Sequence, residues 1–382
     1  MKLTIKRSEL LKLLTYASQA IPSRSAENQY LNYLINVNEE EVSIIASDGS
    51  ISTKVSQGLK DEKGNDVILS LENGTIQTPA KMLLDIISKL GGEIVTLDMV
   101  DTGLMNISDD YSTFNLVTKD GNEYPNVNLV IPEGKIGFTV PLKDLKTLFD
   151  TTSYAVSTKG NELYTGINVK ALMGKLSFIA TDGFRLASLT LPEPTQEANF
   201  TFTCPVKSLD MATKISETGE CTIYLDEQRA LFVSSNVMIS TRLLHGDFLS
   251  TTNLIPPSYP YTFKILTSDF LSSADRVKII SSADNSRNSQ VKLTLSKDGG
   301  ATLSAKSSNY GNSEEKLRVA SLNMEEGTEV FEIYFNVDYA IDAVKALRSD
   351  EITFALNGPT RSVFVKNDNP DNIQLFQPIT AN

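Results

Sequence analysis

Short alternating segments followed by amphipathic stretches occur three times along the chain. Apolar and polar residues alternate at 2–5, 137–140 and 262–265, which is typical of half-buried strands. Apolar residues at helical spacing follow each strand within a few positions. A second strand and helix follow at a similar distance in each copy. The period of roughly 125 to 135 residues is the length of a domain and too long for a solenoid repeat.

The pattern predicts six helices with strands between them. The predicted helices span residues 8–20, 79–90, 141–153, 205–217, 268–281 and 336–348. Each has one apolar stripe and therefore buries one face. Period-2 segments such as 42–46, 175–180 and 301–305 indicate strands. The first two end in Ser47-Asp48-Gly49 and Thr181-Asp182-Gly183, and an Asp-Gly pair is typical of a hairpin turn.

The repeat predicts an α+β protein with three similar domains, each with two helices packed on antiparallel sheets. An aromatic residue followed by an extended segment that ends in Ile-Pro closes the first two copies, at Tyr124 to Pro132 and at Phe248 to Pro256. Proline ends strand pairing and stiffens a linker. We therefore expect domains at residues 1–128, 129–257 and 258–382.

Charge is distributed unevenly along the chain. The 382 residues include 47 Asp or Glu and 35 Lys or Arg, and a net charge of −12 argues against nucleic-acid binding. The six predicted helices, however, hold 11 basic and 10 acidic residues. A solvated helix face explains any one basic pair, whereas recurrence in four of six helices favours a shared basic surface. The recurring pairs are Lys81 with Lys89, Lys143 with Lys146, Lys207 with Lys214, and Lys345 with Arg348.

Residues for catalysis or metal binding are scarce. His245 is the only histidine, and Cys204 and Cys221 lie in strand-like segments without metal or redox spacing. No phosphate-binding glycine loop or hydrolase motif is present. We therefore expect a protein that is not an enzyme and has no metal or cofactor. With no signal peptide or membrane-length apolar run in the sequence, we expect a cytoplasmic protein without a membrane role.

Two segments, taken together with the three copies, resemble a known protein family. Residues 180–187 read Ala-Thr-Asp-Gly-Phe-Arg-Leu-Ala, and Phe335-Asn336-Val337 is followed by Tyr339. With the three copies, they resemble the bacterial DNA polymerase III β subunit, the sliding clamp, over the full chain. The resemblance implies a DNA clamp fold and a head-to-tail homodimer that closes a six-domain ring around duplex DNA. It also implies a non-catalytic processivity subunit that binds the replicative polymerase, the clamp loader and repair proteins through short linear peptides.

The resemblance assigns three sets of residues. Those expected to attract DNA without base readout are Arg24, Lys12, Lys81, Lys89, Lys143, Lys146, Lys207, Lys214, Arg276, Lys278, Lys345 and Arg348. Those expected at the dimer interface are Phe114 and Leu116 against Ile279 and Ile280. Those expected to line the peptide pocket are Tyr164, Thr181, Gly183, Phe184, Arg185, Leu186, Leu249, Leu254, Asn336, Tyr339, Thr360, Ser362, Phe376, Pro378 and Ile379.

The chain departs from the family pattern around this pocket. Phe184 stands where a histidine is usual, residues 250–253 lack the usual Asp-Tyr and basic residues, and the tail at 377–382 lacks the usual methionines and arginine. We therefore expect a pocket with altered polarity and its own peptide preference.

Two other readings stay open at this point. A β-rich three-domain protein that recognises polysaccharides or surfaces would have exposed aromatic platforms and a secretion signal, but the chain has no Trp. An acid-dependent hydrolase would need two carboxylates converging in one cleft, and no pair stands out.

Overall fold

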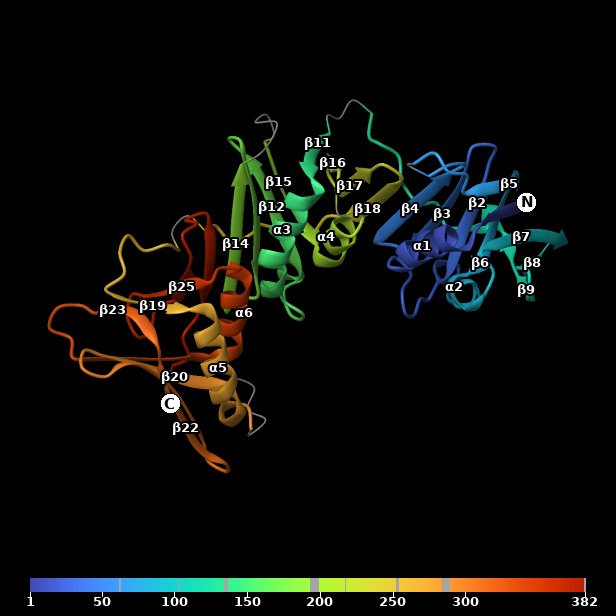
Figure 1. Cartoon of the computed structure of the whole chain (residues 1–382). Coiled ribbons are helices and arrows are strands. Elements are labelled where there is room, and N and C mark those ends of the chain that lie inside the picture. Colours follow the sequence, from blue (N-terminus) through green and yellow to red (C-terminus); the bar gives the residue numbers. More distant parts are fainter. Residues whose placement is uncertain are drawn as a thin grey trace. The chain divides into compact units, whose positions relative to one another are not determined.

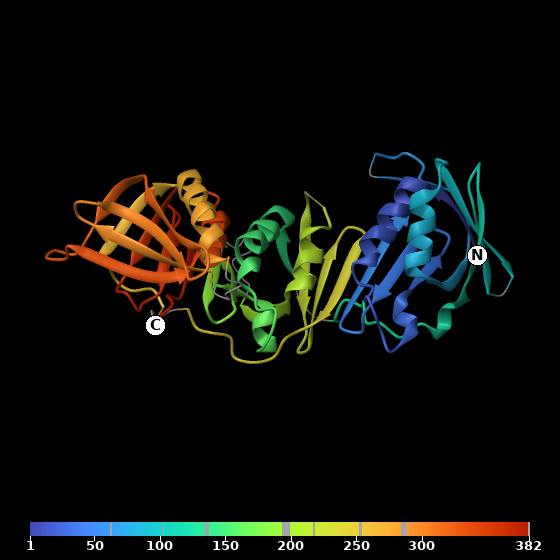
Figure 2. The same cartoon turned by 90° about the horizontal axis from the view of Figure 1, so that it is seen from below.

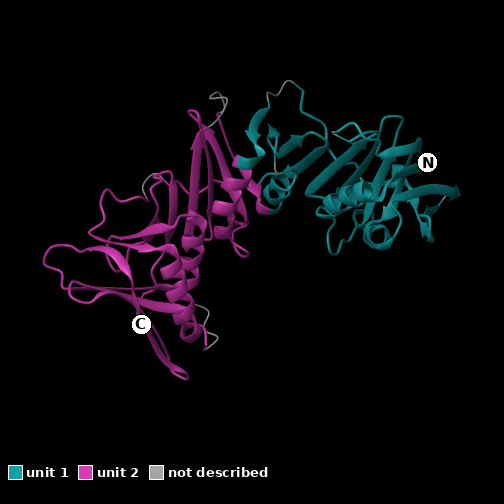
Figure 3. Ribbon diagram, in the orientation of Figure 1, with its two compact units in different colours: residues 1–143, 207–243 teal, residues 144–206, 244–382 magenta. Residues whose placement is uncertain are grey.

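A computed structural model of the chain describes residues 1–380 apart from 62, 102, 134–136, 193–198, 217, 252–253 and 284–288. Its contacts divide it into two compact units, residues 1–143 with 207–243 and residues 144–206 with 244–382 (Figure 3). The division passes through the second expected domain. We describe each unit by itself.

All six predicted helices are present. They are α1 (Arg7–Ser18), α2 (Ala80–Lys89), α3 (Leu142–Thr152), α4 (Val206–Thr213), α5 (Thr267–Ser281) and α6 (Val337–Leu347). Short 3₁₀ turns occur at η1 (Asn28–Leu31), η2 (Gly121–Glu123), η3 (Ser153–Ala155) and η4 (Glu162–Thr165). The predicted helix at 205–217 is too long, because Lys214 donates its backbone N–H three residues back, to Met211 O, and the α-helical ladder ends there.

The first unit contains two antiparallel sheets. One has the order β5 (Ile68–Glu72), β1 (Lys2–Lys6), β7 (Ile94–Asp101), β8 (Leu104–Ser108), β9 (Thr113–Val117). The other has the order β10 (Lys119–Asp120), β6 (Gly74–Pro79), β2 (Asn32–Val37), β3 (Glu41–Ser47), β4 (Ile51–Gly58), β18 (Val237–Arg242), β17 (Arg229–Ser234), β16 (Glu220–Leu225), β11 (Phe138–Pro141). Helices α1 and α2 lie side by side (blue and cyan in Figure 2), and α1 buries Leu10, Leu13, Leu14 and Ala17.

The second unit has the same plan. One sheet has the order β15 (Phe200–Pro205), β12 (Gly166–Leu172), β13 (Lys175–Thr181), β14 (Arg185–Pro192), β27 (Asn372–Phe376), β26 (Val363–Lys366), β25 (Glu351–Leu356), β19 (Tyr261–Leu266), β23 (Val319–Asn323). The other has the order β22 (Gly311–Leu317), β21 (Gly300–Ser307), β20 (Gln290–Ser296), β24 (Val330–Asn336). Helices α5 and α6 lie side by side (Figure 1), over a core in which the Phe263 and Phe354 rings stack with centroids 4.8 Å apart.

Each nine-stranded sheet joins strands from two of the expected domains. Strand β4 pairs with β18 in the first unit, and β14 pairs with β27 in the second. A backbone ladder therefore connects neighbouring domains in addition to the linker.

Candidate functional site

The turn between β13 and β14 is fixed by two side chains. Thr181 donates its hydroxyl to the Arg185 carbonyl at 2.7 Å and accepts the Gly183 N–H at 3.0 Å. Asp182 Oδ1 accepts the backbone N–H groups of Phe184 and Arg185 at 2.8 and 3.0 Å. Gly183 has a φ of +90°, a conformation that L side chains rarely adopt. The Phe184 side chain projects from this rigid turn and is 63% exposed.

Arg185 joins the turn to helix α6. Its Nε donates to Asp182 Oδ2 at 3.0 Å, and its guanidinium donates to Asp342 Oδ2 at 2.5 Å. The guanidinium carbon also lies 5.3 Å from the Tyr154 ring centroid and 4.8 Å from that of Tyr339, within cation–π range. The side chain is only 16% exposed. Two carboxylates and two rings therefore hold Arg185 in one conformation.

Strand β27 brings the end of the chain to this turn. Phe376 is fully buried and pairs with Arg185 in the ladder between β14 and β27. Pro378 forms an isolated bridge with Phe335, and Ile379 donates its N–H to a carbonyl of β24 at 2.7 Å. The structure therefore places the predicted tail residues beside the predicted turn residues.

The start of α6 and the turn before β26 supply polar groups. Asn336 caps α6, because its side-chain oxygen accepts the Asp338 N–H at 2.8 Å. Tyr339 lies in the first turn of this helix, and burial raises the pKa of its hydroxyl. Ser362 is half-buried, whereas Thr360 is exposed.

Apolar residues of the linker after β18 remain exposed. Leu249 is 41% exposed and Leu254 is 36% exposed, whereas Leu186 is buried. Tyr164 contacts Phe248 edge to face, with ring centroids 5.6 Å apart. Of the divergent stretch 250–253, residues 252 and 253 lie outside the described part of the chain, as do residues 381 and 382 of the tail.

Sequence reasoning missed three residues that hold Arg185: Asp182, Asp342 and Tyr154. A signal for Asp182 was available, since Asp226 and Arg229 repeat the same spacing. Asp226 Oδ1 accepts the Arg229 N–H at 2.8 Å, and Oδ2 accepts the Arg229 guanidinium at 2.6 Å. Nothing local in the sequence identifies Asp342 or Tyr154, which come from other elements.

Most of the predicted DNA-contacting residues are exposed, and many are paired. All twelve except Lys278, which is half-buried, are exposed. The ion pairs are Lys12 with Glu9, Lys146 and Arg348 with Asp150, Lys207 with Asp48, Lys214 with Asp210, Arg276 with Glu315, and Lys278 with Asp338. Arg24, Lys81, Lys89 and Lys345 have no ion pair within the described residues. The helix faces are therefore only weakly basic.

Asp150 connects α3 to α6. It accepts from Lys146 at 3.0 Å and from Arg348 at 2.8 Å. Burial alone would raise the pKa of Asp150, but the hydrogen bonds from these two cations lower it below its ordinary value. The carboxylate is therefore ionised at neutral pH and offsets both cations.

The four predicted interface residues lie near the edges of two sheets. Phe114 is 41% exposed on β9, the last strand of its sheet, while Leu116 is buried. Ile279 of α5 is 69% exposed, and Ile280 packs partly against the core. Helix α5 contacts β22, which ends its own sheet.

Two kinds of feature are absent from the described residues. None of the helices there is long and apolar enough to cross a membrane. No cluster of three or more His, Cys, Asp or Glu residues in the same ranges is arranged to hold a metal ion.

The repeated α+β domains, the shared sheets and the Arg185 turn define a DNA clamp of the bacterial type. Sequence profiles described as the N-terminal, central and C-terminal domains of DNA polymerase III beta subunit match residues 1–128, 139–249 and 252–379. The chain therefore belongs to the DNA polymerase III beta subunit family.

Individual sliding clamps are similar to this chain over its whole length, both in sequence and in structure. The chain is 29% identical to the beta sliding clamp of Bacillus subtilis and 30% identical to that of Staphylococcus aureus, with 99% of both chains covered in each case. The crystal structure of the DNA polymerase sliding clamp from B. subtilis superposes with a TM-score of 0.92 and 27% identity, covering all of both chains. The predicted family and clamp fold are confirmed.

Proposed function

We propose that this protein is a DNA sliding clamp that works as a ring-shaped homodimer around duplex DNA and tethers the replicative polymerase. The observation that carries the proposal is the consecutive match of all three clamp domains along one chain. Family membership disfavours the alternative of a polysaccharide-binding protein. We also propose that the chain is non-catalytic, acts on DNA in the cytoplasm and has domains at 1–128, 129–257 and 258–382.

The weak basicity of the helix faces suits a sliding function. A ring holds DNA by enclosing it, so the helices need only attract the backbone without binding it tightly. Seven of the twelve candidate cations have a carboxylate partner, which reduces the attraction at each of those positions. The remaining acidic surface discourages binding of DNA elsewhere on the protein.

Dimer formation is proposed to pair β9 of one copy with β22 of the other. Each strand ends its sheet, so one row of its backbone groups is unpaired within the described residues. Pairing the two edges would satisfy those groups and place Phe114 and Leu116 against Ile279 and Ile280 of the second copy. No residue of β9 is charged, so Glu314, Glu315 and Lys316 of β22 have no charged partner on the opposing strand. We therefore propose that backbone pairing and apolar contact dominate the interface.

Topological binding gives the decisive test. The assembled complex should be retained on nicked circular DNA after loading and lost once the circle is linearised. Native mass measurement should give twice the chain mass of 41.9 kDa. A protein that stays monomeric, or that leaves circles and linear DNA at the same rate, would contradict the proposal.

The peptide pocket is proposed to lie beside the Arg185 turn. The rigid turn, the α6 cap and the exposed linker leucines would give an apolar groove with a few fixed polar groups, which suits an extended peptide. Phe184 adds apolar surface where the family usually has a histidine. We therefore propose that this groove prefers peptides with a large apolar residue at that point.

Binding of a peptide from the tail of the cognate polymerase tests this assignment. Phe184→Ser and Tyr339→Ala should each weaken binding about tenfold or more. Tyr310→Ser is the matched control, because Tyr310 is 64% exposed and lies in the hairpin turn that occupies the corresponding position of the third copy. Unchanged affinity in both pocket variants would remove the assignment.

A further inference from the structure

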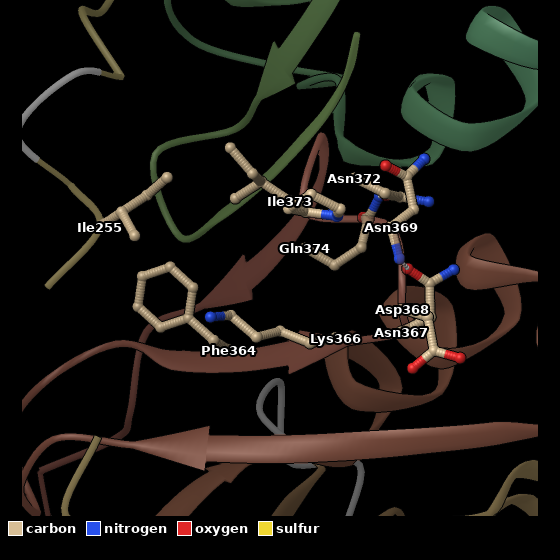
Figure 4. Close-up of a pocket in the computed structure, with 10 residues that line it drawn as sticks. Ile255, Phe364, Lys366, Asn367, Asp368, Asn369, Asn372, Ile373 and Gln374 are labelled. Atoms are coloured by element: carbon tan, nitrogen blue, oxygen red, sulfur yellow. Dashed lines mark hydrogen bonds between the residues drawn. The ribbon is translucent and has the colours of Figure 1, made fainter. Parts of the chain in front are cut away.

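A small cavity lies on the second unit, beside Ile255 of the linker that follows β18 (Figure 4). We call it the linker cavity. It has a volume of about 310 Å³ and is lined by Ile255, Phe364, Lys366 and residues 367–370 and 372–374. None of these residues belongs to the proposed peptide pocket. The volume is at the lower end of the range for small-ligand sites.

Lys366 places an uncompensated charge in this cavity. It lies two residues after Phe364 on β26, and Figure 4 shows its side chain extending toward the Phe364 ring. The ammonium nitrogen lies 4.1 Å from the centroid of the Tyr259 ring. Within the described residues, no ion pair or hydrogen bond joins the Lys366 ammonium group to another side chain or to the backbone. The Tyr259 ring and the apolar part of the cavity wall solvate a cation poorly, and the amides and the Asp368 carboxylate that line the rest of the cavity form no hydrogen bond with the ammonium group.

Neighbouring acidic groups do not neutralise Lys366. Asp368 lines the same cavity but forms no ion pair with Lys366. Asp371 is engaged by Lys175 at 3.8 Å. Burial lowers the pKa of Lys366, because partial loss of water destabilises the charged form of the ammonium group.

A second polar group nearby also lacks a partner. The Tyr259 hydroxyl is buried and has no hydrogen-bond partner among the described residues. A buried donor without an acceptor costs free energy, and so does a desolvated ammonium. Of these two residues only Lys366 lines the cavity, so its ammonium is the group that a ligand there can reach.

We propose that the linker cavity binds a carboxylate group attached to an apolar body. A single cation calls for a monoanion, and the apolar walls of Ile255, Phe364 and Ile373 favour an aliphatic or aromatic attachment. A phosphate dianion would lose far more hydration than one ammonium returns. The carboxylate has two possible sources, a side chain of a bound peptide or a free small acid.

Two probes distinguish these sources. One is 3-phenylpropionate, and the other is the capped tripeptide acetyl-Leu-Asp-Phe-amide; each is titrated by calorimetry beside its neutral amide counterpart, 3-phenylpropionamide or the Asn peptide. The carboxylate forms should bind at least about tenfold more tightly than the amides. Tighter binding of the tripeptide than of 3-phenylpropionate indicates a peptide ligand, and the reverse indicates a free acid.

Variants connect the binding to Lys366. Lys366→Met should weaken binding of the carboxylate probe about tenfold or more, and Lys366→Arg should retain it. Lys175→Met is the matched control, since it removes a nearby exposed lysine that already has a partner, and it should bind like the native chain. Circular dichroism establishes that each variant is folded. The proposal is overturned if no probe binds by about 20 mM, if amides or inorganic phosphate bind as well as the carboxylates, or if Lys366→Met binds normally.

Discussion

Replacing Arg185 with alanine should loosen the junction between β14 and β27. The change removes a hydrogen-bonded ion pair with Asp182, a second with the 41% exposed Asp342, and cation–π contacts with two rings. We assign about 1.5 kcal/mol to the first pair, at most about 0.5 kcal/mol to the second because solvent screens it, and about 0.5 kcal/mol to each ring. The expected loss is therefore about 3 kcal/mol.

Hydrogen exchange of backbone amides measures this loss locally, which matters because a chain of several domains need not unfold in one step. The amides of β14 and β27 should exchange roughly 30 to 150 times faster in the Arg185→Ala variant, corresponding to about 2 to 3 kcal/mol.

Arg229→Ala is the matched control. Arg229 has the same relation to Asp226 that Arg185 has to Asp182, but it lacks the second carboxylate and the rings, and both members of its pair are 27% exposed. Its replacement should cost about 0.5 to 1 kcal/mol. Equal acceleration in the two variants, or none in β14 and β27, would refute the reasoning about Arg185.

Three further predictions concern Asp150, the proposed dimer interface and the helix faces proposed to attract DNA. The lowered pKa of Asp150 means that its contribution to stability is complete above about pH 4 and lost as pH falls through that lowered value, so Asp150→Asn should narrow the difference in melting temperature between pH 7 and pH 2. Phe114→Asp should shift the native mass toward the monomer, whereas Leu69→Asp on β5, at the opposite edge of the same sheet, should leave the dimer intact; a monomer in both variants would contradict the interface. Joint replacement of Lys81 and Lys89 by alanine should reduce the salt dependence of DNA binding by about two units of the log–log slope, and an unchanged slope would exclude both residues from the DNA surface.

The helices could be predicted from the sequence because the apolar stripe that defines each one is formed by residues close together in the chain. Apolar stripes such as Leu10, Leu13, Leu14 and Ala17 determine a buried face without reference to the rest of the chain, and α1 buries those four residues. Only the end of α4 was misplaced by more than two residues, since helix ends depend on weak local preferences.

The pairing of sheets across domain boundaries could not be read from the pattern. Alternation indicates that a strand has a buried face, but it does not specify which distant strand it pairs with. The partners of Arg185 show the same limit, because Asp342 lies 157 residues further along the chain. The family resemblance alone identified Arg185 as a site residue, whereas the side chains that contact it could be identified only from the folded structure.

The position of β27 in the second unit has a consequence for biosynthesis. This strand lies in the interior of a nine-stranded sheet, and its partner Arg185 precedes Phe376 by roughly 190 residues. At translation rates of about 5 to 20 residues per second, the edge of β14 is exposed for on the order of 10 to 40 s before its partner leaves the ribosome. An unpaired strand edge is the part of a sheet most prone to aggregation. Nascent chains of this protein are therefore most vulnerable to misassembly between synthesis of the second and the third domain, when chaperone protection would matter most.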